Sequence, residues 1–349
     1  MEMDDRKLRI LQAIINDYIL TGVPVGSRTI SKKYDMGLSS ATIRNEMSDL
    51  EELGYLDQPH VSAGRVPSAK AYRLYVDGLL KAGKIRDDSA ESISQHFLGR
   101  AHMMEDVIDR AASVISSLTK YTAVVLPPEG KMPKIRTVQL VPVSRSAALV
   151  VIVTDAGVIR DNVVPVSGQA DSDTLYAISR ALTRELGGHT LAEACDILPG
   201  MIERMRENEE VLQGLYGFLN ERRAAPKQPH VAVGGTSNML SYPEYSDVEK
   251  ARSFLNLMET RDRLARIIAG DGEMAFTVRI GPETGVPEMV DCSIVTATYS
   301  TRSGQQGTIG VIGPTRMQYS RVLSILNVMG HQLTTMFSSG EDERMDGKK

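Results

Sequence analysis

A short polar cluster between residues 39 and 45 carries the chemistry for reading DNA. Arg44 can donate two hydrogen bonds to guanine and Asn45 can pair with adenine, each contributing roughly 1–3 kcal/mol of discrimination. Such groups reach base edges when they project from the N-terminal part of a helix that lies in the major groove. The side chains expected on that surface are Ser39, Ser40, Thr42, Arg44 and Asn45.

Basic side chains flank this cluster and are expected to contact phosphates, which fix the register of a protein on DNA without reading sequence. The chain as a whole carries a net charge of -4, yet residues 60–86 contain six Lys and Arg against a single acid, Asp77. A local basic patch on an acidic protein favours site-directed DNA binding over a diffuse basic coat. The predicted DNA contacts outside the polar cluster are Arg28, Lys32, Lys33, His60, Arg65, Lys70 and Arg73.

Three helices and a loop are predicted to position these groups. Asp4 or Asp5 is expected to cap an amphipathic first helix, and Ser27 a second one. Gly37 fits the turn that follows, because a positive φ is cheap only for glycine. The third helix is expected to start after Ser39 and to end at Gly54, with Ile43, Met47 and Leu50 buried. Residues 60–67, with Gly64 and Arg65 near the tip, form the predicted wing.

Beyond residue 100 the sequence alternates between strand-like and helical segments. Helical spacing is expected from residue 104 to 118, from 175 to 223, from 247 to 268 and near the C-terminus. The order of strands, helices, strands and a closing helix predicts an α+β chain whose sheet domain is interrupted by a mainly helical insertion. The strands are expected at residues 122–128, 136–143, 146–155, 157–166, 274–281, 292–300 and 307–314.

No other segment offers comparable chemistry. The loop at 233–238 lacks the GK[ST] ending of a phosphate-binding loop, and the six histidines have no metal-ligand spacing. Cys195 and Cys292 lie far apart without an activating signature, which indicates a reducing compartment and core or surface roles. The sequence therefore predicts a cytoplasmic protein that is not an enzyme, with no cofactor, no metal and no membrane contact.

The motifs closely resemble one protein family. The stretch GSRTISKKYDMGLSSATIRNEMSDLEELGYLDQPHVSAGRVPS is similar to the N-terminal signature of the HrcA family of bacterial heat-inducible transcription repressors. YRLYVDGLL at 72–80 and IGPTRMQYSRV at 312–322 also resemble segments of that family, whereas Val61 stands where threonine is expected. The resemblance implies a homodimer that represses chaperone operons through an inverted-repeat operator, the CIRCE element. It also implies release on heat stress and a functional partnership with the GroE chaperonin.

The resemblance also gives names to the domains. The implied fold is an N-terminal winged helix-turn-helix followed by a GAF-like sheet domain, which is interrupted by an inserted dimerisation domain. The predicted boundaries are 1–75 for the winged helix, 76–103 for a helical linker, 104–170 and 273–338 for the GAF-like domain, 171–272 for the insertion and 339–349 for a disordered tail.

Alternatives remain open from the sequence. A metabolite bound in the GAF-like domain would make the chain a ligand-sensing winged-helix regulator, since such pockets are apolar with a few polar groups. The winged helix could also serve protein contacts, whereas a purely structural three-helix bundle would leave Arg44 and Asn45 without a role on an exposed face.

Overall fold

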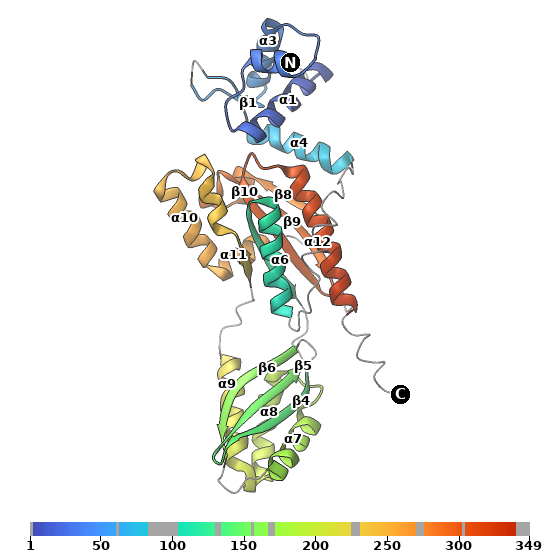
Figure 1. The fold of residues 1–349 in the computed structure, drawn as a ribbon, viewed down its shortest axis with the longest axis vertical. Coiled ribbons are helices and arrows are strands. Elements are labelled where there is room, and N and C mark those ends of the chain that lie inside the picture. The colour runs from blue at the N-terminus through green and yellow to red at the C-terminus, as the bar shows by residue number, and fades with distance from the viewer. Residues whose placement is uncertain are drawn as a thin grey trace. The chain divides into compact units, whose positions relative to one another are not determined.

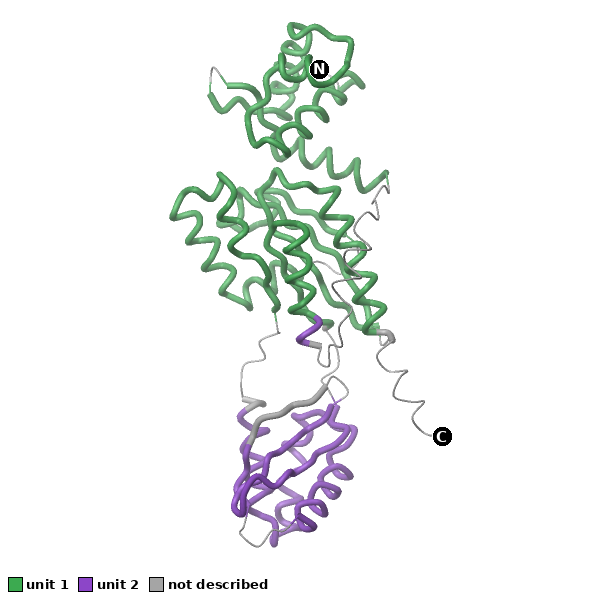
Figure 2. The backbone as a smooth tube through the Cα atoms, viewed as in Figure 1, with its two compact units in different colours: residues 1–99, 108–128, 229–349 green, residues 100–107, 129–228 purple. Residues whose placement is uncertain are grey.

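The computed structural model describes residues 3–60, 63–82, 104–129, 134–154, 157–166, 172–224, 231–269, 276–301 and 304–339. The chain divides into two compact units, residues 1–99, 108–128 and 229–349 in the first and residues 100–107 and 129–228 in the second (Figure 2). Helices and strands occur in separate runs along the chain, as expected of the predicted α+β class (Figure 1). Among the described residues, no helix combines the length and apolar character needed to cross a membrane.

The first unit begins with a small helical assembly. Its elements are α1 (Asp5–Thr21), α2 (Ser27–Lys33), α3 (Ser40–Glu52), the paired strands β1 (Leu56–Asp57) and β2 (Val66–Pro67), and α4 (Ala69–Ala82). Asp4 and Ser39 cap α1 and α3 with their side chains, as predicted, whereas Gly26 precedes α2 and offers no side-chain cap. Gly37 has the positive φ expected of the turn between α2 and α3, so the three-helix arrangement follows local sequence signals.

A five-stranded sheet forms the rest of the first unit. Its strand order is β7-β3-β10-β9-β8, and the strands are β3 (Thr122–Glu129), β7 (Ala232–Gly234), β8 (Phe276–Ile280), β9 (Cys292–Ser300) and β10 (Gln306–Pro314). Helices α6 (Met104–Thr119) and α12 (Tyr319–Ser339) cover one face, and α10 (Val248–Glu259) and α11 (Arg261–Ile268) cover the other (Figure 1). Apolar side chains of β9, β10, α10 and α11 share one buried cluster, which fixes the helices to the sheet.

The second unit has a separate sheet of three antiparallel strands, β4 (Ile135–Ser144), β5 (Ala147–Thr154) and β6 (Gly157–Pro165). Helices α7 (Ser172–Leu186), α8 (Leu191–Arg204) and α9 (Glu209–Ala224) pack on one face. Strand positions such as Val138, Val150 and Ile152 alternate into this core, while their neighbours point away from it. The strand–helix boundaries match the sequence prediction closely.

The unit boundaries differ from the predicted domain boundaries. The sequence assigns residues 104–170 to the GAF-like sheet, yet β4, β5 and β6 pair only with one another, because their buried face packs on α7, α8 and α9. Conversely, α10 and α11 fall inside the predicted insertion at 171–272 but pack on the five-stranded sheet. The second unit therefore consists of residues 129–228 together with residues 100–107, and residues 108–128 between them belong to the first unit.

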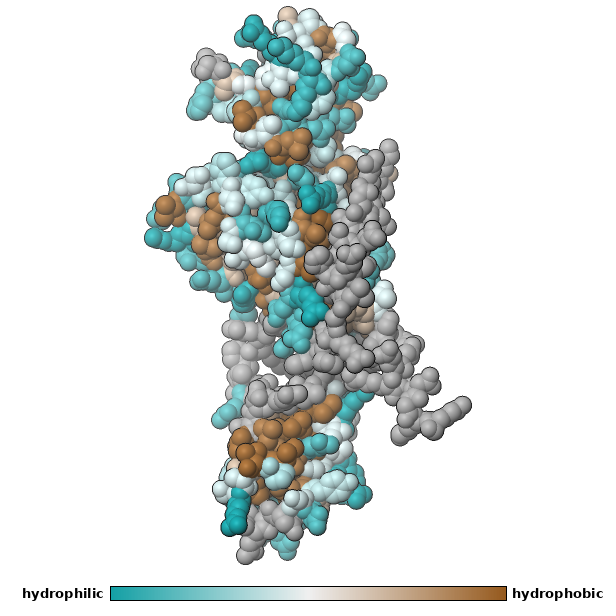
Figure 3. All heavy atoms as spheres, in the orientation of Figure 1, coloured by the Kyte–Doolittle hydropathy of each residue, from teal (hydrophilic) through white to brown (hydrophobic). Residues whose placement is uncertain are grey.

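The outer face of the three-stranded sheet is apolar, and no helix among the described residues of the second unit covers it. Val141 is 43% exposed, Val143 61% and Val163 53%, and hydrophobic side chains gather over these strands in Figure 3. Leu149 lies opposite both Val141 and Val163 in the strand pairing, so the patch runs across all three strands. A contiguous exposed apolar patch of this kind marks an interaction surface.

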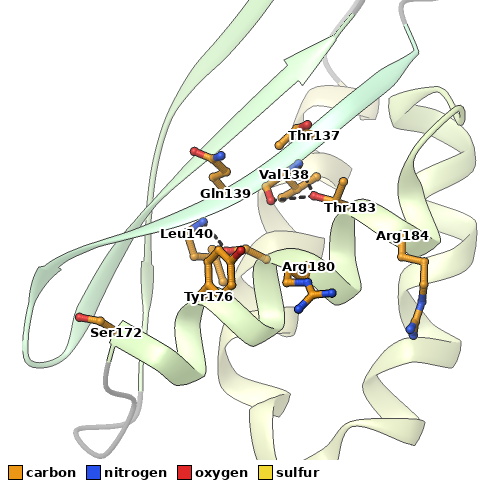
Figure 4. A pocket seen from close by; sticks show the side chains of 10 residues that line it. Thr137, Val138, Gln139, Leu140, Ser172, Tyr176, Arg180, Thr183 and Arg184 are labelled. Atoms are coloured by element: carbon orange, nitrogen blue, oxygen red, sulfur yellow. Dashed lines mark hydrogen bonds between the residues drawn. The ribbon is translucent and has the colours of Figure 1, made fainter. Parts of the chain in front are cut away.

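The free edge of β4 is closed by hydroxyl groups of α7. Thr183 and Ser179 accept hydrogen bonds from the amides of Val138 and Leu140 at 3.0 and 2.9 Å, and Thr183 donates one back to the Val138 carbonyl (Figure 4). A shallow groove of about 550 Å³ lies along this contact. The pairing satisfies backbone groups that an edge strand would otherwise present for pairing with another chain.

Candidate nucleic-acid interface

The predicted reading helix is α3, and its outer side is unoccupied. The Ser39 hydroxyl accepts a hydrogen bond from the Thr42 amide at 3.1 Å, so these two residues also cap the helix. Ser40 is half-buried, while Arg44 and Asn45 are exposed and have no hydrogen bond or ion pair within the described part of the chain. Donors and acceptors that face solvent from the first turns of such a helix are available to base edges.

The acidic side chains of α3 are tied back to α1. Lys7 contacts Glu46 at 3.0 Å and Asp49 at 3.2 Å, and Arg6 donates to Glu46 at 3.3 Å. Hydrogen bonds to Glu46 and then Asp49 raise the pKa of Lys7 above its ordinary value, so the lysine stays charged. These pairs neutralise acids that would otherwise repel phosphates. Lys7 is not among the residues predicted from the sequence. Its position four residues before the buried Leu11 puts it on the buried side of α1, which the sequence pattern could have indicated.

The basic residues near α2 fall into free and paired groups. The side chains of Arg28, Lys32 and His60 are exposed and, among the described residues, have no hydrogen-bond or ion-pair partner. Lys33 instead forms an ion pair with Asp17, a carboxylate whose side chain is only 6% exposed. That hydrogen bond raises the pKa of Lys33. Lys33 therefore supports the packing of α2 on α1 even if it also contacts DNA.

Arg65 and Lys70 are also engaged within the N-terminal assembly. The Arg65 backbone pairs with Val25 through two hydrogen bonds of 2.8 and 2.9 Å, which places it at the base of the β1–β2 hairpin rather than near a tip. Its guanidinium contacts Glu51 of α3 at 2.7 Å. Lys70 donates to the Leu53 carbonyl at 2.9 Å and lies over the Tyr55 ring. Val61 and Ser62 of the predicted wing lie outside the described residues.

Arg73 lies on α4 and contacts the sheet part of the first unit. Its guanidinium donates to Glu283 and, at 2.6 Å, to the Val278 carbonyl of β8. The sequence gives no signal for this pairing, because its partners are more than 200 residues away. The prediction that Arg73 contacts DNA stays a prediction, and it would require the side chain to leave these partners.

The thiols and the metal-ligating residues offer no second site. Burial raises the pKa of Cys292 to about 12, and its sulfur lies 2.5 Å from the Tyr245 hydroxyl. Cys195 is also buried, in the core of the second unit. A protonated, buried thiol is a poor nucleophile. Within the described ranges, no three His, Cys, Asp or Glu side chains are placed to hold a metal ion.

A helix-turn-helix with a free polar outer side, attached to a larger α+β assembly, defines a DNA-binding transcription regulator. Residues 105–323 match the family model described as HrcA protein C terminal domain. The chain is 42% identical over 336 residues to the heat-inducible transcription repressor HrcA of Clostridium tetani, covering 95% of each chain. It is 40% identical over 332 residues to that of Acetivibrio thermocellus, covering 94% of this chain and 95% of the relative.

A crystal structure described as that of a hypothetical protein has the same fold, with a TM-score of 0.75 and 26% identity, and the match covers 97% of this chain and 99% of that one. The chain belongs to the HrcA family of heat-inducible transcription repressors. Its function is the negative regulation of transcription in the heat-shock response.

Proposed function

We propose that the chain acts as a homodimer that binds an inverted-repeat operator of the CIRCE type upstream of chaperone operons and leaves it on heat stress. The observation that carries this proposal is the outer side of α3, where Arg44 and Asn45 are free while Glu46 and Asp49 are held by α1. The resemblance of the N-terminal motif to the HrcA family implies the chaperone operons as targets and the GroE chaperonin as the partner that maintains activity.

The DNA contacts divide by role. Ser40, Arg44 and Asn45 are the proposed base readers, since they project from the N-terminal half of α3. In this proposal residues 3–82 form a winged helix, with the β1–β2 hairpin as its wing. Ser39 and Thr42 shape the helix start through their capping hydrogen bond. The proposed phosphate anchors are Arg28, Lys32, Lys33, His60, Arg65 and Lys70.

We assign dimerisation to the second unit. In this proposal the second unit is the domain inserted into a GAF-like domain. The support is the exposed valine patch of β4 and β6, which a second copy of the same face would cover. Val141→Asp should therefore give a monomer in analytical ultracentrifugation. Arg136→Asp is the matched control, since Arg136 is an exposed polar position on the same strand. A dimer that survives Val141→Asp would contradict this assignment.

A metabolite-controlled regulator is the alternative, and the packing gives it no specific support. Phe254, Leu257 and Met289 are at most 2% exposed, and they belong to the cluster that fills the space between the five-stranded sheet and α10 and α11.

The deciding experiment compares Arg44→Ala with Arg28→Ala in gel shifts on the operator and on a scrambled duplex. Arg44→Ala should lower operator affinity by about 10- to 100-fold and barely affect scrambled DNA, because it removes a base contact. Arg28→Ala should weaken both duplexes equally and reduce the salt slope by about 0.9. Arg28 is a cleaner control than Lys33, whose removal would leave Asp17 buried without its partner. Equal binding of the wild-type chain to both duplexes would refute the proposal.

A further inference from the structure

Two segments that take no part in base reading meet in the first unit. Residues 72–80 and 312–322 both resemble family segments, and neither supplies the proposed readers. Tyr72 of α4 and Tyr319 of α12 lie with ring centroids 6.0 Å apart, and they are 2% and 0% exposed. Two stretches more than 200 residues apart in sequence therefore form one buried contact between the N-terminal assembly and the sheet assembly.

Arg73, which follows Tyr72 in α4, makes a second contact, and this one consists of directional hydrogen bonds. Its guanidinium reaches the Glu283 carboxylate through Nε at 3.1 Å and through Nη2, which also donates to the Val278 carbonyl. Burial alone would raise the pKa of Glu283, but hydrogen bonds from Arg73 and from the Ile280 amide outweigh it and hold the pKa below its ordinary value. The pair is therefore ionised, and it depends on the forked shape of arginine.

Arg316 forms a third contact, beneath the end of α1. Glu244 accepts hydrogen bonds from its guanidinium at 2.6 and 3.3 Å, and the Tyr242 ring lies 5.5 Å away. Gly22 ends α1 with a φ of +66°, and a Cβ added there would lie 3.1 Å from the Arg316 guanidinium carbon. The C-terminus of α1 thus packs closely on Arg316, which would have to shift to accommodate a side chain at Gly22.

These contacts hold α4 and the C-terminal end of α1, the helix against which the reading helix packs. α1 is linked to α3 through Lys7 and its two acids, and α4 packs against α1 and β2. The outer side of α3 meanwhile stays free, so the closed contacts are compatible with DNA reading.

We infer that Arg73 and Arg316 are positioning residues that set the half-site spacing a dimer accepts. In the proposed dimer, each N-terminal assembly is held on its own sheet assembly. Once one of them is bound, the other meets the second half-site at a high effective concentration only when the spacing and helical phase of the two half-sites match the dimer. This inference rests on the proposed binding of an inverted repeat by a homodimer.

The test uses full-length Arg73→Ala and Arg73→Lys with three DNAs: the operator, the operator with about 5 bp inserted to rotate one half-site by half a turn, and a single half-site. The wild-type chain should prefer the operator to the other two. Arg73→Ala should bind the half-site like the wild type, lose about tenfold on the operator and discriminate less against the insertion. Arg73→Lys should behave like Arg73→Ala, because one ammonium cannot reproduce the fork.

A phosphate contact would give a different pattern. If Arg73 binds DNA, Arg73→Ala weakens all three DNAs and lowers the salt slope by about 0.9, and Arg73→Lys restores both, which would overturn the inference. An unchanged spacing profile would also overturn it. If the wild-type chain itself does not prefer the operator, the proposed function has failed instead.

A side chain added at Gly22 provides an independent test of the role of Arg316. Gly22→Ala should loosen the spacing preference, because its methyl group presses on Arg316. Gly54→Ala is the matched control, since Gly54 has a similar positive φ of +75° and no atom within 4 Å of an added Cβ. Both variants carry the same kind of backbone strain. Equal effects of the two on spacing preference would count against a role for Arg316.

Discussion

Tyr72→Phe and Tyr319→Phe each remove one hydroxyl group from a pair of neighbouring tyrosines, and the two changes should affect stability in opposite directions. The Tyr72 hydroxyl is buried and, among the described residues, has no hydrogen-bond partner. The Tyr319 hydroxyl donates to the Thr315 carbonyl at 2.6 Å and lies 2.7 Å from the Ser293 hydroxyl. The same Tyr→Phe change thus deletes an unpaired group in one case and a doubly paired group in the other.

The magnitudes follow from the cost of burying polar groups. A buried hydroxyl without a partner costs roughly 1–3 kcal/mol, so Tyr72→Phe should stabilise the first unit by about 1 kcal/mol once the small void is allowed for. Tyr319→Phe should destabilise it by about 1–3 kcal/mol, because Ser293 and the Thr315 carbonyl lose a partner. In a unit of this size, 1 kcal/mol moves the Tm by roughly 2–4 °C.

Thermal unfolding followed by calorimetry measures both shifts. Burial raises the pKa of both tyrosines, so both hydroxyls stay protonated at neutral pH and the comparison is free of ionisation. The expected result is a higher Tm for Tyr72→Phe and a lower Tm for Tyr319→Phe. A loss of stability in Tyr72→Phe equal to that in Tyr319→Phe would show that the Tyr72 hydroxyl has a partner, and would refute the reasoning.

Two further predictions concern the hairpin and the ionised interface. Gly64→Ala should destabilise the N-terminal assembly, because an added Cβ would lie 2.5 Å from the Val25 carbonyl. Gly26→Ala is the control, since no atom lies within 4 Å of an added Cβ there. Chemical denaturation of both variants measures the difference in stability. The ionised form of Glu283 stabilises the folded chain above the ordinary glutamate pKa of 4.5, and this contribution is lost as the pH falls through the lower folded-state pKa. The Tm difference between wild type and Glu283→Gln should therefore be present at pH 7 and close as the pH falls below 4.5 through the lower folded-state pKa of Glu283; a constant difference would contradict the role given to this pair.

Local signals made the N-terminal elements predictable from sequence. Ser39 is a capping residue followed by a helical stripe, and Gly37 and Gly54 mark the turns with the positive φ that glycine allows. β-branched runs also located the strands within a residue or two, because apolar residues either alternate along a strand, as in β5, or run continuously through it, as in β9. The chemistry of the reading surface follows from these elements alone.

Strand partnership and long-range ion pairs could not be predicted in the same way. Nothing in the run at 136–143 indicates whether it joins the five-stranded sheet or a separate one, since both offer an apolar face. The placement of α7 decides it, because Ser179 and Thr183 close the edge of β4. Arg73 likewise looks like any exposed arginine until Glu283 is brought beside it by the fold.

The contact between the N-terminal assembly and the sheet assembly is built differently from the hydrophobic cores of these two assemblies. Contacts across it include one ring pair, the partly exposed ion pair of Arg73 with its hydrogen bond to the Val278 carbonyl, and the packing of Gly22 on Arg316. Partly exposed ion pairs each contribute only about 0–1 kcal/mol, whereas the sheet is held by a continuous cluster of buried apolar side chains. Local opening is drawn from the least stable contacts of a structure. In the proposed function, modest heating can therefore release the repressor by loosening this contact while the N-terminal assembly and the sheet assembly both stay folded.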